Sequence, residues 1–237
     1  PTPAPLDFPP IAYREILADA TLDGDMLTFS AETDGDALSF NLAGAWSLAR
    51  DFRTVRLDGS VGRFVPNQLN LTEKYPGVEL AADFDVDLEG PQLHNMLGHI
   101  DIRDFSIRRS PSEVFTLGHL GLKSDEGQLR LESDFINGTI QGSYDFRHIA
   151  RAASAIASRV LPSVVATPAR QLAAADTPND FTFRFRVGET ERAAEFFRLP
   201  VSVIYPVEIT GEMNESASDM ALAIDAPYLR QGNKLIE

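Results

Sequence analysis

The sequence predicts a mainly β protein, organised as a long, curved, predominantly antiparallel sheet with two helices. Over residues 78–88 apolar side chains occupy the even positions and, apart from Ala81, carboxylates occupy the odd positions. Alternation with a period of two is typical of a strand with one apolar and one polar face. Similar segments follow along most of the chain, and an aliphatic-x-Gly-x-aromatic-x-apolar pattern recurs at residues 42–48 and 140–146. Repeated strand units favour stacking into an elongated sheet, because no unit buries its apolar face alone.

The segment 78–88 also indicates the size of that sheet. At ~3.3 Å per residue it spans roughly 35 Å, about twice the common strand length in globular proteins. A series of such strands creates an extended apolar surface. The functional question is what this surface binds or packs against.

The composition limits the possible functions. The 237 residues suffice for one large all-β domain or two smaller ones, and 43% hydrophobic with 24% charged residues is typical of a globular chain. A net charge of −14 and a pI of about 4.7 repel phosphate backbones and anionic headgroups. Nucleic acid is therefore not an expected partner.

The chain contains no cysteine, which excludes disulfides, thiolate catalysis and Cys-ligated metals. No apolar run reaches the ~18 residues of a membrane span, and no signal peptide is recognisable. The sequence begins with a proline-rich stretch and stops just after a strand-like segment. We therefore expect an excerpt of a longer protein whose targeting elements lie outside it.

The N-terminal part predicts a series of short strands. After a proline-rich entry, strand candidates occupy residues 22–32, 38–48 and 53–64. The turn signal Asp34-Gly35-Asp36 separates the first two candidates. The strands of the central block then follow after Pro76-Gly77.

In the central block the apolar positions change parity without an intervening turn. Ile100 and Ile102 are even-numbered, whereas Phe105 and Ile107 are odd-numbered. Such a change predicts a β-bulge or a bend, because half of the apolar side chains would otherwise point into water. Further along, Asn137-Gly138 is compatible with a tight hairpin turn or with a bulge within one long strand.

Two helices are expected in the C-terminal half. The first, near residues 146–161, has Asp145 as its N-cap and carries an apolar stripe at helical spacing. The second is short, near residues 190–197, and strands are expected at 181–187, 201–209 and 220–224. The expected organisation is an entry segment at residues 1–20, a β-repeat region at 21–146, a helix and Ala/Pro-rich linker at 147–180, and a further β-repeat region at 181–237.

No catalytic constellation is recognisable, so the chain is not expected to be an enzyme and no cofactor is predicted. Among the four histidines, His94 and His99 are five residues apart. Neither cysteine nor a fixed carboxylate spacing supports a zinc site there. The histidines are therefore predicted to be surface or turn residues, and no metal site is expected.

An acidic series in residues 83–89 invites comparison with a calcium ladder or a glycosidase pair. Side chains two residues apart share one face of a strand, and a straight acidic row forms no pocket that shifts pKa values. We interpret the series as the solvated outer face of the sheet, which also discourages aggregation. Its members are Asp83, Asp85, Asp87 and Glu89.

Several segments of the chain resemble the AsmA-like repeats of TamB-type proteins (translocation and assembly module), and in form they are most similar to those of the Bacteroidetes. The resemblance covers most of residues 20–237 and rests on degenerate β repeats. The segments that carry it are residues 97–107, 120–122, 129–146, 199–211 and 231–236.

The resemblance implies a periplasm-spanning protein of Gram-negative bacteria, anchored in the inner membrane by a segment outside this sequence. It implies a sheet folded as a taco-like groove lined by aliphatic and aromatic side chains. Such proteins are linked to phospholipid transport toward the outer membrane and, with an Omp85-family barrel partner, to outer-membrane protein assembly. The family implies no catalytic residues. The expected helix and linker interrupt the strands, so the sequence leaves the continuity of the groove open.

We therefore expect a non-enzymatic segment whose apolar groove conducts phospholipid acyl chains. One alternative is a chaperone-like docking scaffold that binds unfolded outer-membrane strands by strand addition at an exposed edge. Another is a secreted hydrolase with a β-sandwich core. The residues predicted to line the groove are Val78, Leu80, Phe84, Val86, Leu88, Leu129, Leu131, Phe135, Phe183 and Phe185.

Overall fold

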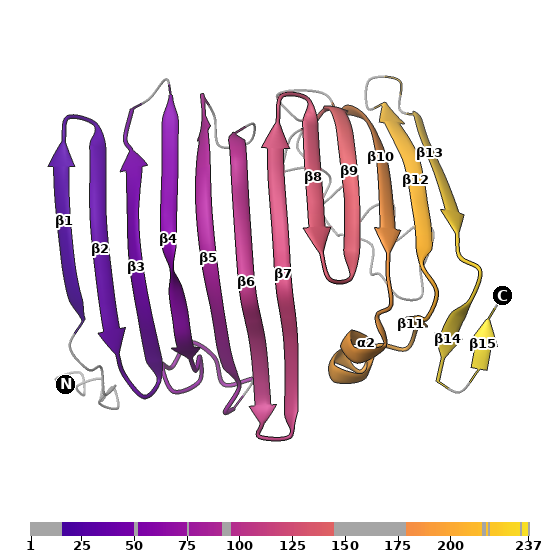
Figure 1. The fold of residues 1–237 in the computed structure, drawn as a ribbon, viewed down its shortest axis with the longest axis horizontal. Helices are drawn as coiled ribbons and strands as arrows, with labels where there is room; N and C mark the ends of the chain where they lie inside the picture. The colour runs from indigo at the N-terminus through magenta and orange to yellow at the C-terminus, as the bar shows by residue number, and fades with distance from the viewer. Residues whose placement is uncertain are drawn as a thin grey trace, which may run out of the picture.

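One open, curved antiparallel sheet dominates the computed structural model, which describes residues 16–49, 52–74, 76–91, 96–144, 179–214, 217, 219–232 and 234–236 (Figure 1). Among these residues, twelve strands form the sheet, and its spatial order follows the chain. The mainly β, antiparallel prediction is confirmed. The strands are β1 (Leu17–Asp23), β2 (Met26–Asp34), β3 (Leu38–Ser47), β4 (Arg53–Phe64), β5 (Glu79–Gly90), β6 (Leu97–Ser110), β7 (Glu113–Asp125), β8 (Gln128–Ser133), β9 (Ile136–Ser143), β10 (Asp180–Val187), β12 (Val207–Asn214) and β13 (Asp219–Asp225).

The sheet is continuous across the expected helix and linker, where the sequence alone did not decide whether the groove continues. Strand β9 pairs with β10 in register, with Ile140 opposite Phe183, although residues 144–179 separate them in the chain. The helix expected near residues 146–161, most of the linker at 147–180 and residues 1–15 of the entry segment lie outside the described residues. Strand β1 begins at Leu17.

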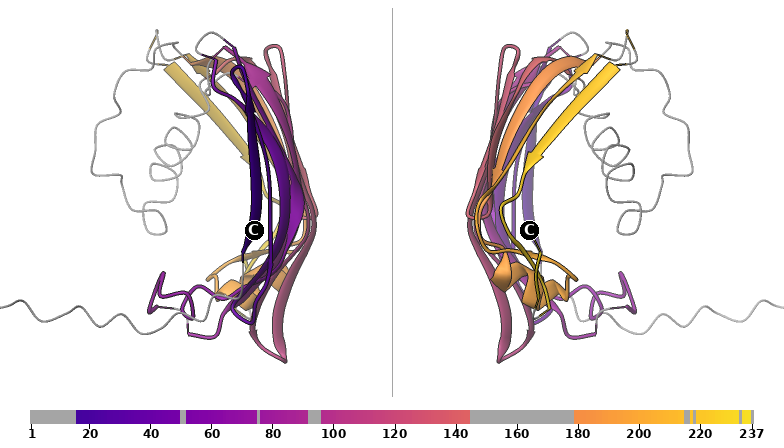
Figure 2. Two further views of the ribbon diagram at one scale, coloured as in Figure 1. Left: turned by 90° about the vertical axis from the view of Figure 1, so that its left-hand side faces the viewer. Right: turned by 90° about the vertical axis from the view of Figure 1, so that its right-hand side faces the viewer.

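The predicted change of phase in β6 is a β-bulge. Asp83 pairs with Arg103 but Ala81 pairs with Ser106, so β6 carries one extra residue opposite β5. Asp104 sits at this point with a φ of 51°. The pairing of β4 with β5 has a similar shift of register, between Val61 and Phe64. Bulges bend strands and increase their twist, and the sheet is curved, with a concave and a convex face (Figure 2).

Three predicted strand boundaries are wrong, each because a local turn was misplaced. Residues 22–32 are not one strand, since the chain turns at Gly24, whose φ is 58°, between β1 and β2. The pair Asn137-Gly138 forms neither a turn nor a bulge, because both residues lie inside β9 and pair with β10. Residues 201–209 are divided between β11 (Ser202–Val203) and β12.

The second predicted helix is confirmed as α2 (Glu191–Phe197), with Thr190 at its N-cap. It lies beside the lower part of β7, below the shorter β8–β9 hairpin (Figure 1). The Arg109 guanidinium lies 4.2 Å from the centroid of the Phe196 ring, and Nη1 donates to the Phe196 carbonyl at 2.7 Å. Helix α2 therefore covers part of a strand edge that β8 leaves unpaired.

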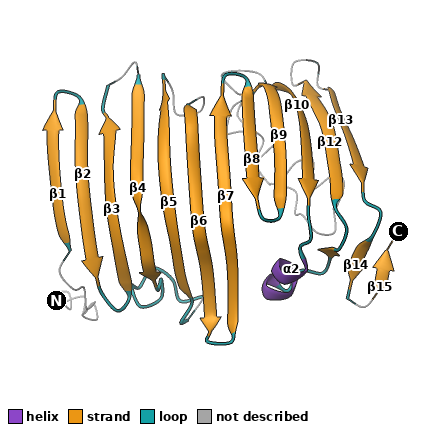
Figure 3. Cartoon of the chain, viewed as in Figure 1, coloured by secondary structure: helices purple, strands orange, loops and turns teal. Residues whose placement is uncertain are grey.

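Beyond α2, a small second sheet completes the described part of the chain. Its central strand is β14 (Leu229–Gln231), which pairs on one side with β11 and on the other with β15 (Lys234–Ile236). All its pairings are antiparallel. It lies at the same end of the molecule as α2 (Figure 3).

Candidate apolar groove

The register of the sheet aligns apolar side chains into rows that cross every strand. Each residue of such a row lies opposite its neighbour on the next strand, so all members share one face. None of the members is charged or polar. One row comprises Ala20, Phe29, Gly44, Leu57, Val86, Ile100, Leu122, Leu131, Gly138, Phe185, Ile209 and Ile224.

A second row runs parallel to the first, two residues further along each strand. Ser124 is its one polar member. It comprises Leu22, Leu27, Trp46, Val55, Leu88, Gly98, Ser124, Leu129, Ile140, Phe183, Gly211 and Leu222. The two rows form a continuous apolar band, which we call the groove face.

The groove face is the concave face of the sheet. Phe115 lies opposite Ile107, which lies opposite Leu80, so these side chains point to the same side as the rows. The Phe115 ring contacts α2, with centroid distances of 5.5 Å to Phe196 and 5.0 Å to Phe197. Helix α2 lies on the concave side of the sheet (Figure 2).

Coverage of the groove face differs along its length. Strands β8, β9 and β10 contain a buried cluster of Leu129, Ile140 and Phe181. At the edge strand β1, Leu22 is 60% exposed, against 6% for Leu129 in the same row. Trp46 on β3 and Ile224 on the opposite edge strand β13 are also exposed. Between these regions the apolar residues of β5 are half-buried. Among the described residues, no second sheet packs against the twelve strands.

Most of the residues predicted to line the groove lie together on this face. Leu129 is part of the buried cluster, whereas its strand neighbour Leu131 is half-buried. Val78 precedes β5, and Phe135 lies in the β8–β9 turn, where its ring stacks on Phe115 at 5.9 Å. The remaining predicted residues are half-buried on strands β5 and β10: Leu80, Phe84, Val86, Leu88, Phe183 and Phe185.

The prediction missed the N-terminal third of the groove face, including Phe29 and Leu57. Its sequence signal was the glycine motif at residues 42–48, and Gly44 in that motif has a structural role that Gly138, outside it, shares. A Cβ on Gly138 would lie 2.0 Å from Cδ1 of Phe185, and one on Gly44 would lie 2.8 Å from Cζ of Phe29. Glycine on one strand makes room for an aromatic ring on the next, an arrangement known as aromatic rescue.

At the centre of the sheet the charged side chains lie on the convex face. The acidic series Asp83 to Glu89 lies there, on the odd positions of β5. Asp87 accepts from Arg56 at 3.4 Å, and Glu79 accepts from Arg63 at 2.8 Å. Each strand of the sheet centre thus separates an apolar side from a charged side, as the alternation predicted.

The convex face also holds the two described histidines. His99 bonds to Asp85, and His119 Nε2 lies 2.9 Å from Asp101 Oδ1. Both histidines are partly exposed strand residues, whereas His94 and His148 lie outside the described residues.

At one end of the strands a pocket of 580 Å³ adjoins the buried cluster. Acidic and aromatic side chains line it together. Burial raises the pKa of the Tyr144 hydroxyl above its ordinary value of 10.0. The Ser124 hydroxyl lies 3.5 Å from it. The pocket-lining side chains of these two kinds are Phe52, Glu89, Asp125, Glu126 and Tyr144.

The fold and this surface define a class of protein: an open, curved antiparallel sheet with one apolar concave face. No protein-family model matches the chain, and no curated protein or solved structure shows significant similarity to it. The described residues include no helix with the length and hydrophobicity of a membrane span.

Proposed function

We propose that the groove face binds the acyl chains of phospholipids and forms part of a non-enzymatic conduit between the inner and outer membranes. The protein would then be a periplasmic, inner-membrane-anchored member of the TamB-type group that its repeats resemble. The observation that carries the proposal is the pair of apolar rows, which cross all twelve strands without a charged residue.

The dimensions of the rows suit a hydrocarbon chain. At ~4.8 Å between neighbouring strands, a row across twelve strands is roughly 50 Å long. One acyl chain spans half of a hydrocarbon core that is ~30 Å thick, or about 15 Å. The groove face is therefore long enough for a whole acyl chain to remain in contact with apolar side chains.

The energetic benefit comes from keeping the chain out of water. Each methylene group that is removed from water gains ~0.8 kcal/mol. Half-buried side chains such as Phe84 and Val86 offer apolar surface that is still accessible. The net charge of −14 keeps so apolar a sheet soluble, and it makes attraction of anionic headgroups an unsuitable basis for binding.

A pair of charge insertions on β5 tests the proposal. Phe84→Asp places a carboxylate in the groove, whereas Ala81→Asp places one on the opposite face of the same strand. We expect Phe84→Asp to abolish binding of a fluorescent acyl-chain phospholipid analogue while the far-UV circular dichroism spectrum stays that of a folded sheet. Ala81→Asp should bind like the wild type. Unfolding by Phe84→Asp alone would mean a closed core and would remove the basis of the proposal.

A second candidate function has one observation in its favour. Every residue of the edge strand β1 is exposed, and among the described strands β1 pairs only with β2. An exposed edge accepts an added strand, so β1 is a candidate docking site for unfolded outer-membrane strands delivered to an Omp85-family barrel. Photo-crosslinks from Ala20 to an unfolded outer-membrane polypeptide, with no lipid bound elsewhere, would favour docking over conduction.

A further inference from the structure

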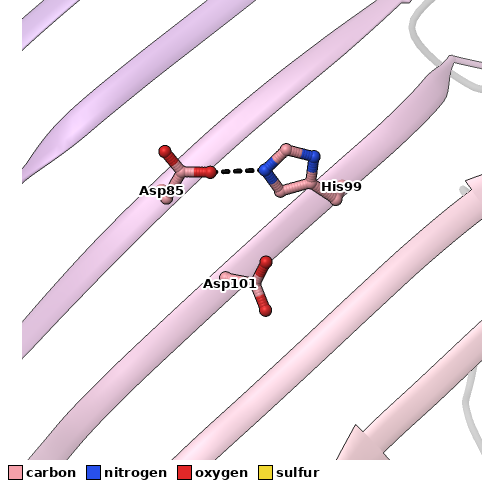
Figure 4. Close-up of side chains that lie close together, drawn as sticks. All are labelled: Asp85, His99 and Asp101. Carbon is pink, nitrogen blue, oxygen red and sulfur yellow. Dashed lines mark hydrogen bonds and ion pairs between the residues drawn. The ribbon is translucent and has the colours of Figure 1, made fainter.

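The convex face carries a cluster of metal-binding side chains at the centre of the sheet. Asp85 comes from β5, and His99 and Asp101 come from β6 (Figure 4). His99 Nε2 bonds to Asp85 Oδ1, and one ligand atom from each of the three residues lies within 4.8 Å of the others. The three side chains thus come from two neighbouring strands and place three potential ligand atoms close together.

The sheet register creates this convergence and an accumulation of negative charge. Asp85 lies directly opposite Asp101 on one side and directly opposite Asp58 on the other. Like charges in directly opposed positions destabilise a sheet. A cation between Asp85 and Asp101 would relieve that repulsion.

The next strand, β7, supports the cluster from its other side. His119 Nε2 lies 2.9 Å from Asp101 Oδ1. Gly121 lies opposite Asp101, and a Cβ there would lie 2.9 Å from His119 Cε1 and 3.1 Å from Asp101 Oδ1. Glycine therefore keeps open the space that this pair occupies, within a pocket of 300 Å³ that His99 also lines.

Two neighbouring cations on this face pair with other carboxylates. Arg56 pairs with Asp87 at 3.4 Å, and Lys123 pairs with Asp125 at 3.6 Å. Arg130 and Glu132 line the pocket further along the sheet.

We infer that Asp85, His99 and Asp101 bind a divalent zinc ion, with His119 as the outer-shell partner that orients Asp101. One imidazole and two carboxylates are ligands that zinc accepts without thiolate. Three protein ligands leave a fourth position for water. Ligating carboxylates in metal sites are themselves hydrogen-bonded, as Asp101 is by His119. The bound ion links β5 to β6, and this inference is independent of lipid binding.

Calorimetric titration of the whole chain with zinc sulfate tests the site. We expect one zinc ion per chain in the wild type, no detectable binding after His99→Ala or Asp85→Asn, and about a 10-fold weaker affinity after His119→Ala, the lower end of the range for outer-shell changes. Asp83→Asn is the matched control, because it removes the same charge from the same face of β5 two residues away. It should bind like the wild type.

Two outcomes would overturn the inference. Equal weakening by Asp83→Asn and Asp85→Asn would mean diffuse attraction to an acidic surface. Titration of the wild type with cobalt chloride requires no substitution, and it should give the visible absorption bands of Co²⁺ bound by nitrogen and oxygen. A wild-type chain that gives neither bands nor heat carries only histidine–aspartate pairs at this place.

Discussion

Two regions of the groove face share one pattern of alternation but differ in burial. Around β8 to β10, Leu129, Ile140 and Phe181 are buried, whereas in β1 to β3 Leu22 and Trp46 are exposed. The register places Leu22 and Leu129 in the same cross-strand row. Period-two alternation therefore identifies the face to which a side chain belongs, while other parts of the chain decide whether that face is covered.

The largest expected effect is a difference in stability between alanine variants of these two leucines. Leu129→Ala removes a buried side chain and should lower the free energy of unfolding by about 2–5 kcal/mol. Leu22→Ala makes the same chemical change at an exposed position and should alter it by less than about 0.5 kcal/mol. Urea denaturation followed by circular dichroism measures both. Similar losses for the two variants would show that the groove face is covered equally in both regions.

A smaller effect is expected from the glycines beneath aromatic rings. Gly138→Ala should cost about 1–3 kcal/mol of stability, because the new methyl group would overlap the Phe185 ring near its attachment point. Gly44→Ala should cost less, because its overlaps are smaller: the new Cβ would lie 2.6 Å from the Arg56 carbonyl oxygen and 2.8 Å from the tip of the Phe29 ring. Gly62→Ala is the control, because its new Cβ would meet no atom closer than 3.5 Å. It therefore measures the effect of replacing glycine on the entropy of the unfolded chain, without a steric overlap. A cost for Gly44→Ala as large as that for Gly138→Ala would contradict this ranking by overlap with the neighbouring ring.

The smallest effect concerns pH. Burial raises the pKa of Tyr144 in the folded state above its unfolded value of 10.0. The neutral hydroxyl therefore contributes stability that is complete below about pH 10 and is lost as the pH rises through the folded-state pKa. The stability of the wild type relative to Tyr144→Phe should thus fall as the pH rises from about 10 to about 12. A relative stability that rises over this interval would mean that the phenolate is the form favoured by folding.

The sequence was informative where the signal is local. Alternation over residues 78–88 identified both faces of β5, and the change of parity between Ile102 and Phe105 located the bulge in β6. Turns were less predictable. Gly24 ends β1 inside a segment whose apolar pattern continues on both sides, and Asn137-Gly138 favours a turn that the pairing with β10 overrides.

Neighbouring side chains on the convex face could not be predicted from the sequence, because long-range strand pairing brings them together. Sequence spacing drew attention to His94 and His99, whereas the structure places His99 and His119 on neighbouring strands, twenty residues apart. No local pattern links these two residues, because only the β6–β7 register brings their surroundings together. The burial of Leu129 likewise depends on contacts with Ile140 and Phe181 on other strands, which the alternation within one strand does not predict.

The central claim is that the groove face contacts lipid directly. A photoreactive benzophenone side chain at position 84 tests it when the protein is incubated with phospholipid vesicles and irradiated. The same group at position 83 of β5, on the convex face, is the matched control. Mass spectrometry should find phospholipid adducts joined through their acyl chains at position 84 and none at position 83. Adducts at neither position, or equal amounts at both, would contradict the account.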